Sequence, residues 1–177
     1  MDLCGKPVIE RVLDRVRKAN YIDDIIVAAP HPINCSATVN IGSEDDVLER
    51  YYFCAKENFA DVIVRITSDC PLVEPFLIDL CVFNILNYNL DYVACIEPYY
   101  PDGLDVEVFT MNTLERAYNK ARKQSDREHV TPFMRRDKLS SMYIISGGFG
   151  KEKVSIDTKE DLERVRKLWN GRTKQFS

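Results

Sequence analysis

The sequence predicts an α/β fold in which a mostly parallel sheet carries helices on both faces. Three short runs rich in apolar, often β-branched side chains indicate buried strands, at residues 25–29, 61–66 and 91–96. Segments with apolar residues at helical spacing lie before, between and after these runs. Strands that alternate with helices along a chain are typical of parallel sheets. At 177 residues the chain suits one domain with a substantial core.

The composition is that of a globular protein and argues against several functional classes. Hydrophobic residues make up 45% and charged residues 29%, and the net charge of −4 disfavours nucleic acid as a partner, because nucleic-acid binders usually carry a basic face. No apolar run approaches the ~20 residues of a membrane span, and no leader opens the chain, so we expect a cytoplasmic protein without a membrane partner. The six cysteines form no CxxC pair, which favours reduced thiols over a zinc site.

The first half of the chain shows clear helix-start signals. Pro7 suits the first turn of a helix, and Ser43 with Asp46 three residues later resembles a capping box. The expected elements are helix 7–19, strand 25–29, a brief strand 37–41, helix 44–58, strand 61–66 and helix 74–88.

The second half contains one strand with a distinct alternation. In residues 104–109 apolar side chains alternate with Asp105 and Glu107, which predicts a half-exposed strand with both carboxylates on one face. Glycines at 147–150 predict a turn. The other expected elements are strand 91–96, helix 112–122, a short helix that includes 127–133, strands 142–146 and 154–156, and helix 158–169.

Two aspartates follow predicted strands and are candidate metal ligands. Asp69 comes after strand 61–66 and Asp157 after strand 154–156. Ligands of open α/β sheets bind outside the carboxyl ends of the strands, where carboxylates can hold Mg²⁺ against phosphate oxygens. The structural alternative is helix capping, because Asp69 lies just before Pro71 and Asp157 precedes a helix.

Six segments in the same order along the chain resemble the cytidylyltransferase family of sugar-acid activation, in particular the group of spore coat polysaccharide biosynthesis protein F. They are Gly5-Lys6-Pro7, residues 42–51, 61–72, 100–109, 127–132 and 155–162. The resemblance implies a Rossmann-like nucleotide-diphospho-sugar transferase sandwich, Mg²⁺ as cofactor, and a homodimer. It also implies transfer of CMP from CTP to a sugar acid or related sugar for surface polysaccharide synthesis, with release of pyrophosphate.

The sequence departs from this family at its start. Family members begin with a strand that ends in a Gly-rich loop around the triphosphate of CTP, and no such loop occurs here. We therefore expect residues 1–177 to form a single cytidylyltransferase-like domain that is N-terminally incomplete and lacks its first strand. Two alternatives stay open: a glycosyltransferase that uses a nucleotide-sugar, and a non-catalytic remnant or assembly subunit.

The resemblance and the strand-end positions give a set of candidate site residues. Asp69 and Asp157 correspond to the catalytic, metal-binding aspartates. The expected nucleotide-binding residues are Lys6, Arg65 and Ser68, and the expected acceptor-binding residues are Asp102, Asp105, Glu107, Arg127, Glu128 and His129. Some of them have a structural alternative. These alternatives are a helix-start role for Lys6, an acidic partner for Arg65, and a solvated face or an ion pair for the carboxylates of strand 104–109.

Overall fold

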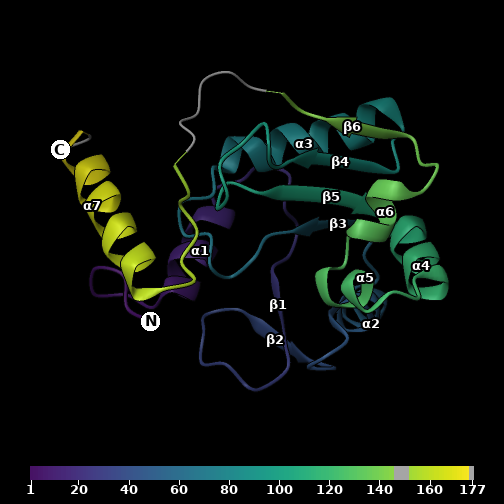
Figure 1. The fold of residues 1–177 in the computed structure, drawn as a ribbon, viewed down its shortest axis with the longest axis horizontal. Helices are drawn as coiled ribbons and strands as arrows, with labels where there is room; N and C mark the ends of the chain where they lie inside the picture. Colours follow the sequence, from purple (N-terminus) through teal and green to yellow (C-terminus); the bar gives the residue numbers. More distant parts are fainter. Residues whose placement is uncertain (146–151, 176–177) are drawn as a thin grey trace.

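The computed structural model describes residues 1–145 and 152–175 and shows a four-stranded sheet between two layers of helices (Figure 1). Its strand order is β3 (Val62–Arg65), β5 (Val106–Thr110), β4 (Tyr92–Cys95) and β6 (Ser141–Tyr143). β3, β4 and β6 run in one direction, whereas β5 is antiparallel to its neighbours β3 and β4. The predicted α/β fold is confirmed.

Side chains that alternate along the central strands divide the core into two layers. On β4, Val93 and Cys95 belong to the core shared with α1, α3 and α7, whereas Tyr92 and Ala94 belong to the core shared with α2, α4 and the α5–α6 region. All four are fully buried, as expected for a strand covered on both faces. The helices are α1 (Val8–Val16), α2 (Val47–Glu57), α3 (Pro75–Tyr88), α4 (Met111–Lys120), α5 (Gln124–His129), α6 (Pro132–Arg136) and α7 (Lys159–Gln175).

The two remaining strands form a separate sheet. β1 (Ile26–Ala29) and β2 (Thr38–Ile41) pair in parallel with each other. Within the described ranges neither is hydrogen-bonded to the larger sheet, so β3 forms the edge of that sheet. All four residues of β3 are only partly buried, although three of them are β-branched apolar residues. β1 and β3 therefore belong to different sheets.

Several local predictions were wrong. α2 begins at Val47, because the carboxylate of Asp46 caps it by accepting a 2.9 Å hydrogen bond from the N–H of Glu49, so Ser43 is not the cap. Residues 154–156 form no strand. The single helix predicted around 127–133 is two helices, α5 and α6, separated at Val130, which has a positive φ of 69°.

The predicted half-exposed strand is also wrong, since β5 lies in the middle of its sheet. Residues Val106, Glu107, Val108 and Phe109 are each at most 1% exposed.

The predicted strand 142–146 is shorter, as β6 ends at Tyr143, and the turn predicted at 147–150 lies outside the described residues. No helix in the described part of the chain is long and apolar enough to cross a membrane.

Candidate active site

The fold brings the two candidate metal ligands together. Asp69 lies in the loop after β3, and Asp157 lies just before α7. The N–H of Ile156 donates a 2.9 Å hydrogen bond to the carbonyl oxygen of Asp69, so the two aspartates lie on adjoining stretches of backbone. Asp69 is partly buried, whereas the side chain of Asp157 is 54% exposed. Both carboxylates therefore remain open to a ligand from solvent.

A hollow of about 330 Å³ lies beside Asp69. This volume falls within the range of small-molecule pockets, roughly 300–1,000 Å³. Ser68, a predicted nucleotide contact, lines it together with Asp69, and the first turn of α1 forms one wall. Lys6 precedes that turn, but its ammonium group is paired with Asp14 at 2.5 Å. The hollow is lined by Met1, Pro7, Val8, Ile9, Ile33, Ser68, Asp69 and Ile156.

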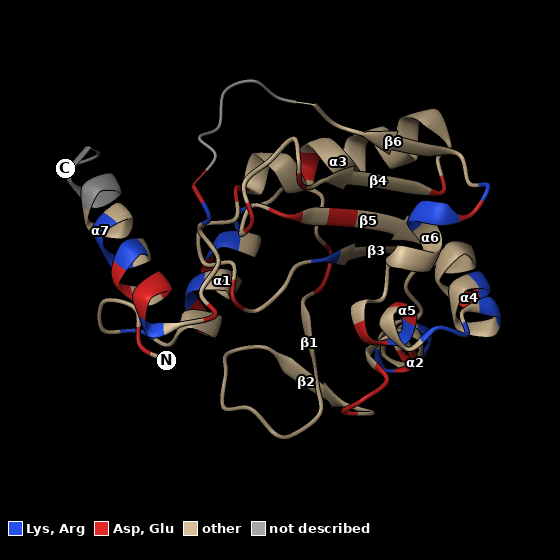
Figure 2. Ribbon diagram, in the orientation of Figure 1, with Lys and Arg blue, Asp and Glu red and all other residues tan. Residues whose placement is uncertain are grey.

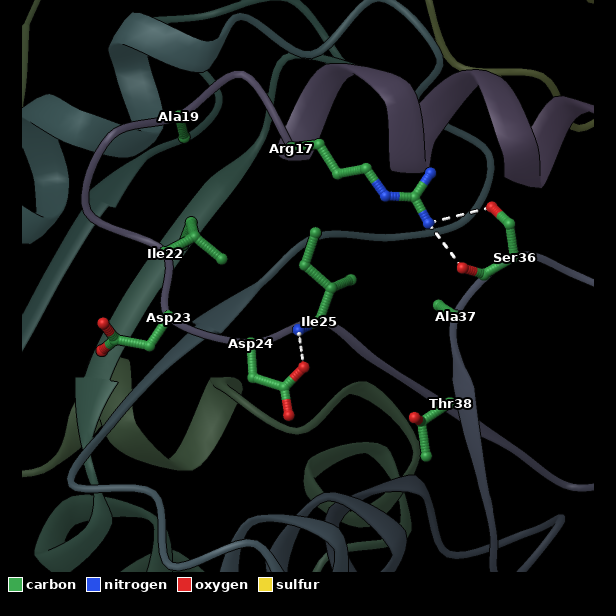
Figure 3. A pocket seen from close by; sticks show the side chains of 9 residues that line it. All are labelled: Arg17, Ala19, Ile22, Asp23, Asp24, Ile25, Ser36, Ala37 and Thr38. Atoms are coloured by element: carbon green, nitrogen blue, oxygen red, sulfur yellow. Dashed lines mark hydrogen bonds between the residues drawn. The ribbon is translucent and has the colours of Figure 1, made fainter.

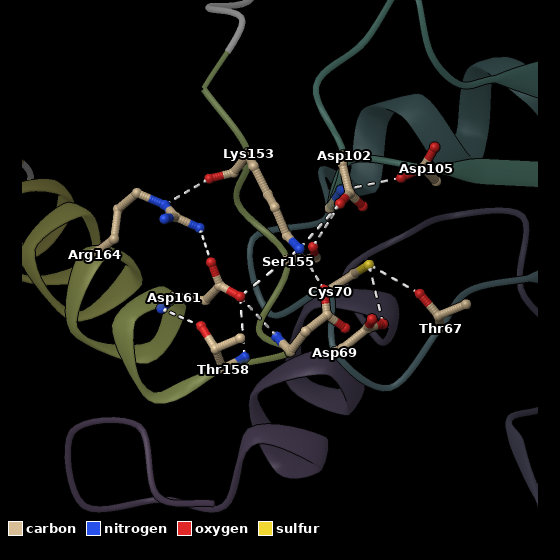
Figure 4. A network of polar contacts seen from close by, with 12 residues as sticks. Thr67, Asp69, Cys70, Asp102, Asp105, Lys153, Ser155, Thr158, Asp161 and Arg164 are labelled. Atoms are coloured by element: carbon tan, nitrogen blue, oxygen red, sulfur yellow. Dashed lines mark hydrogen bonds and ion pairs between the residues drawn. The ribbon is translucent and has the colours of Figure 1, made fainter.

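Next to this hollow, one lysine is surrounded by carboxylates (Figure 4). Lys153 contacts the carboxylate of Asp157, and its Nζ lies 3.5 Å from Asp102 and 3.7 Å from Asp161. These carboxylates, Asp157 first, raise the pKa of Lys153. Hydrogen bonding from Arg164 lowers the pKa of Asp161, which stays ionised. Acidic residues also lie along β5 and at the start of α7 (Figure 2).

Asp102 and Asp105, the predicted acceptor contacts, lie near this cluster. The hydroxyl of Ser155 donates to Asp102 at 2.9 Å, and the N–H of Gly103 donates to Asp105 at 3.0 Å. Burial raises the pKa of Asp105, and the nearby carboxylates of Asp102 and Glu107 act in the same direction. These carboxylates reach the site from the loop between β4 and β5.

Cys70 also belongs to this region, although the sequence indicated no role for it. Its thiol lies 3.0 Å from the hydroxyl of Thr67 and 3.5 Å from the carboxylate of Asp69. Burial raises the pKa of the Cys70 thiol, and the charge of Asp69 raises it further. A protonated thiol is a poor nucleophile, so Cys70 helps to shape the loop rather than act in covalent chemistry.

The carboxylates fit a cation that arrives with phosphate groups. In the described ranges, no three His, Cys, Asp or Glu side chains lie close enough to hold a metal ion by themselves. Mg²⁺ is usually held by one or two carboxylates together with substrate phosphates, so two carboxylates such as those of Asp69 and Asp157 are consistent with such a site. The donor set is also chemically right, because hard cations prefer oxygen ligands.

Glu107 is placed away from solvent in a polar network. It is 1% exposed and accepts hydrogen bonds from Arg65 at 2.7 Å, Arg135 at 2.6 Å and the hydroxyl of Tyr92 at 2.5 Å. Burial alone would raise the pKa of Glu107, but Arg65 and Arg135 outweigh it and lower the pKa. The acidic partner considered for Arg65 is therefore present. Arg135 and Tyr92 were not among the predicted site residues, because the sequence pattern did not show that Glu107 is buried and needs hydrogen-bond donors.

The three candidates on α5 are not brought to Asp69. Arg127 pairs with Asp46 at 2.5 Å and donates to the carbonyl of Tyr118 at 2.8 Å, which ties α5 to α2 and α4. Glu128 and His129 are exposed. α5 packs against α2 and α6, away from α7 (Figure 1). Their acceptor-binding role stays a prediction.

A second hollow, of about 400 Å³, lies between the end of α1 and the β1–β2 sheet (Figure 3). None of the predicted site residues lines it. Its cationic side chain, Arg17, donates to the carbonyl and hydroxyl oxygens of Ser36 at 2.6 and 2.9 Å. The carboxylate of Asp24 accepts a hydrogen bond from the N–H of Ile25 at 2.7 Å. These groups are engaged in holding the local chain, so the hollow beside Asp69 is the better candidate.

Comparison with known proteins decides the family. The sequence profile described as cytidylyltransferase matches residues 1–176. The chain belongs to the cytidylyltransferase family. It is 41% identical over 144 residues to an uncharacterized protein of Methanocaldococcus jannaschii, covering 76% of this chain and 58% of that protein. It is 30% identical over 155 residues to the spore coat polysaccharide biosynthesis protein SpsF of Bacillus subtilis, covering 83% of this chain and 62% of that protein.

The solved structures agree with this family at the level of the fold. A cytidylyltransferase from Leptospira borgpetersenii superimposes with a TM-score of 0.85 at 24% sequence identity, covering 94% of this chain and 76% of that one. The predicted family and its fold are confirmed. This cytidylyltransferase chain spans about three fifths of the length of the two curated relatives.

Proposed function

We propose that this chain provides the metal-binding and acceptor-side parts of a Mg²⁺-dependent cytidylyltransferase. The enzyme would transfer CMP from CTP to a sugar acid or related sugar and release pyrophosphate. The observation that carries the proposal is the contact of Ile156 with Asp69, which sets Asp69 and Asp157 side by side next to a ligand-sized hollow. Membership of the cytidylyltransferase family supports CTP as the nucleotide.

In this reaction a hydroxyl oxygen of the acceptor forms a bond to the α-phosphorus of CTP, and the bond from that phosphorus to pyrophosphate breaks. Such transfers leave the protein little covalent work, so positioning and charge neutralisation dominate. A divalent cation held by Asp69 and Asp157 would neutralise the phosphate oxygens.

The chain's own residues would position the two substrates. Ser68 is exposed and lines the hollow, and its hydroxyl would contact the nucleotide. Asp102 and Asp105, from the neighbouring loop, would accept hydrogen bonds from acceptor hydroxyls. Arg65 and Glu107 lie opposite each other on β3 and β5 and form an ion pair. They would not contact the substrates but would hold the two strands that precede and follow the site loops.

The names of relatives and the family resemblance support a proposed biological setting. SpsF of Bacillus subtilis is named for spore coat polysaccharide synthesis, which supports a product destined for a surface polysaccharide. CTP is a soluble metabolite, so we place the enzyme in the cytoplasm. By the family resemblance we propose that it works as a homodimer.

Analysis of the released product tests this function. The protein is incubated with Mg²⁺, CTP and a panel of sugar acids, and pyrophosphate is measured. Pyrophosphate that depends on the sugar acid and is lost in Asp69→Asn supports the proposal. Release of free nucleotide diphosphate or monophosphate from nucleotide-sugars, without pyrophosphate from CTP, would instead identify a glycosyltransferase.

A further inference from the structure

The carboxylates around Lys153 differ in how firmly other groups hold them. Asp161 accepts hydrogen bonds from the N–H groups of Thr158 at 3.0 Å and Asp157 at 3.2 Å, and it is paired with Arg164. These partners lie on or next to α7, so Asp161 is fixed within its own helix turn. It does not depend on Lys153 for its charge balance.

Asp157 is in a different position. Its carboxylate is 54% exposed, and its contact within the described side chains is with Lys153. Asp102, by contrast, accepts a 2.9 Å hydrogen bond from the hydroxyl of Ser155. The ammonium group of Lys153 therefore neutralises above all the carboxylate that the proposed function assigns to the metal.

We propose that Lys153 is the built-in counter-cation of the metal site. It holds Asp157 while no divalent cation is bound, and it is displaced from Asp157 when one binds. This inference rests on the proposed function. A cation at Asp157 would lie close to the ammonium group, and like charges at such separations repel. Lys153 is thus a positioning residue that competes with the metal.

The surroundings provide Lys153 with a place to go. Its Nζ already lies 3.5 Å from Asp102 and 3.7 Å from Asp161, close to hydrogen-bonding distance of both. A small rotation of the flexible side chain away from Asp157 keeps the ammonium group beside these two carboxylates. Displacement of Lys153 from Asp157 therefore breaks one ion pair. It leaves no uncompensated charge, because Lys153 stays beside Asp102 and Asp161 while the divalent cation neutralises Asp157.

Binding of Mn²⁺ alone tests this inference, because electron paramagnetic resonance detects free Mn²⁺ without any turnover. Lys153→Met should bind Mn²⁺ about two- to fivefold more tightly than the parent, the range for loss of one partly exposed competing ion pair. Lys159→Met is the matched control, since it removes the same charge from an exposed residue near the same aspartate. Equal gains in both variants, or no gain in Lys153→Met, would overturn the inference.

Two further variants separate this inference from the proposed function. Asp157→Asn should weaken Mn²⁺ binding, and adding Lys153→Met to it should restore nothing. If Asp69→Asn and Asp157→Asn both bind Mn²⁺ like the parent, the metal site itself is wrong. If they weaken binding while Lys153→Met leaves it unchanged, the metal site stands and the role of Lys153 fails. Circular dichroism of each variant shows whether it is folded.

Discussion

The N–H of Ile156 donates a hydrogen bond of 2.9 Å to the carbonyl oxygen of Asp69. On the other side, the N–H groups of Val154 and Ser155 donate to the carbonyl oxygen of Asp102 at 2.6 and 3.2 Å. The segment before α7 is therefore held between the loop after β3 and the loop after β4. These backbone contacts place the segment that carries Asp157 beside the loop of Asp69.

Gly103→Ala should disrupt this arrangement. Gly103 has a φ of +102°, and a Cβ there would lie 2.2 Å from the backbone N of Ser155. Because both backbones would have to move, we expect a loss of about 3 kcal/mol in the free energy of unfolding, measured by urea denaturation. Mn²⁺ binding should weaken as well, since Asp157 moves with the segment.

Gly5→Ala is the matched control for that variant. Gly5 also has a positive φ, +81°, but a Cβ there would meet nothing within 4 Å. Only backbone strain remains, so the loss should be about 1 kcal/mol and Mn²⁺ binding should stay at the parent level. A Gly103→Ala protein as stable as Gly5→Ala would show that the close approach to Ser155 is not real.

Glu107→Gln should destabilise the fold. The change leaves Arg65 and Arg135 without the carboxylate that both bind, and breaking such a buried pair costs about 3 kcal/mol after allowance for the partial exposure of Arg135. Chemical denaturation at neutral pH measures this. Glu163→Gln, at an exposed position of α7, should change stability by less than about 0.5 kcal/mol. Similar losses in the two variants would contradict the network.

The pH dependence of the stability that Glu107 provides follows from its lowered pKa. Its contribution to stability is complete above the ordinary value of 4.5 and is lost as the pH falls through the lower, folded value. The difference in unfolding free energy between the parent and Glu107→Gln should therefore shrink below about pH 4.5. A difference that grows toward acidic pH would mean that Glu107 is protonated in the folded protein.

Asp46→Ala should lower stability by about 2 kcal/mol, because Asp46 both caps α2 and binds Arg127 of α5. Asp45→Ala is the control: this neighbour is exposed, and the change should have little effect. Thermal unfolding of the two variants makes the comparison. If both melt like the parent, the cap and the ion pair contribute nothing measurable.

Asp105→Asn tests the acceptor side of the site. Asp105 is bonded to the N–H of Gly103 and lies on the loop that carries Asp102, so the change should raise the KM for the acceptor more than the KM for CTP. Steady-state kinetics with each substrate varied in turn separates the two effects. An equal loss for CTP would remove Asp105 from the acceptor side.

The order of helices and strands could be predicted from the sequence because apolar periodicity reports which faces are buried. The failures occurred where tertiary contacts outweigh local pattern. Glu107 looks solvent-facing by alternation, yet β5 is a central strand whose second face is covered by helices, and Arg65 and Arg135 neutralise the buried carboxylate. Local pattern does not show how many layers cover a strand.

The site could be predicted in part for a similar reason. Asp69 and Asp157 come together as expected, although residues 154–156 form no strand, because backbone hydrogen bonds to two loops replace the missing ladder. Arg127 is not brought to them, since it lies on α5, where it is bound to Asp46. The role of Lys153 could not be read from the sequence, because its carboxylate partners come from different segments.

Calorimetric titration of CTP, with and without Mg²⁺, tests most directly whether Asp69 and Asp157 form a metal–nucleotide site. We expect the parent chain to bind CTP only with Mg²⁺, and this binding to be lost in both Asp69→Asn and Asp157→Asn, while both variants keep the parent's melting temperature within a few degrees. CTP binding that is the same with and without Mg²⁺, or that survives both substitutions, would contradict it.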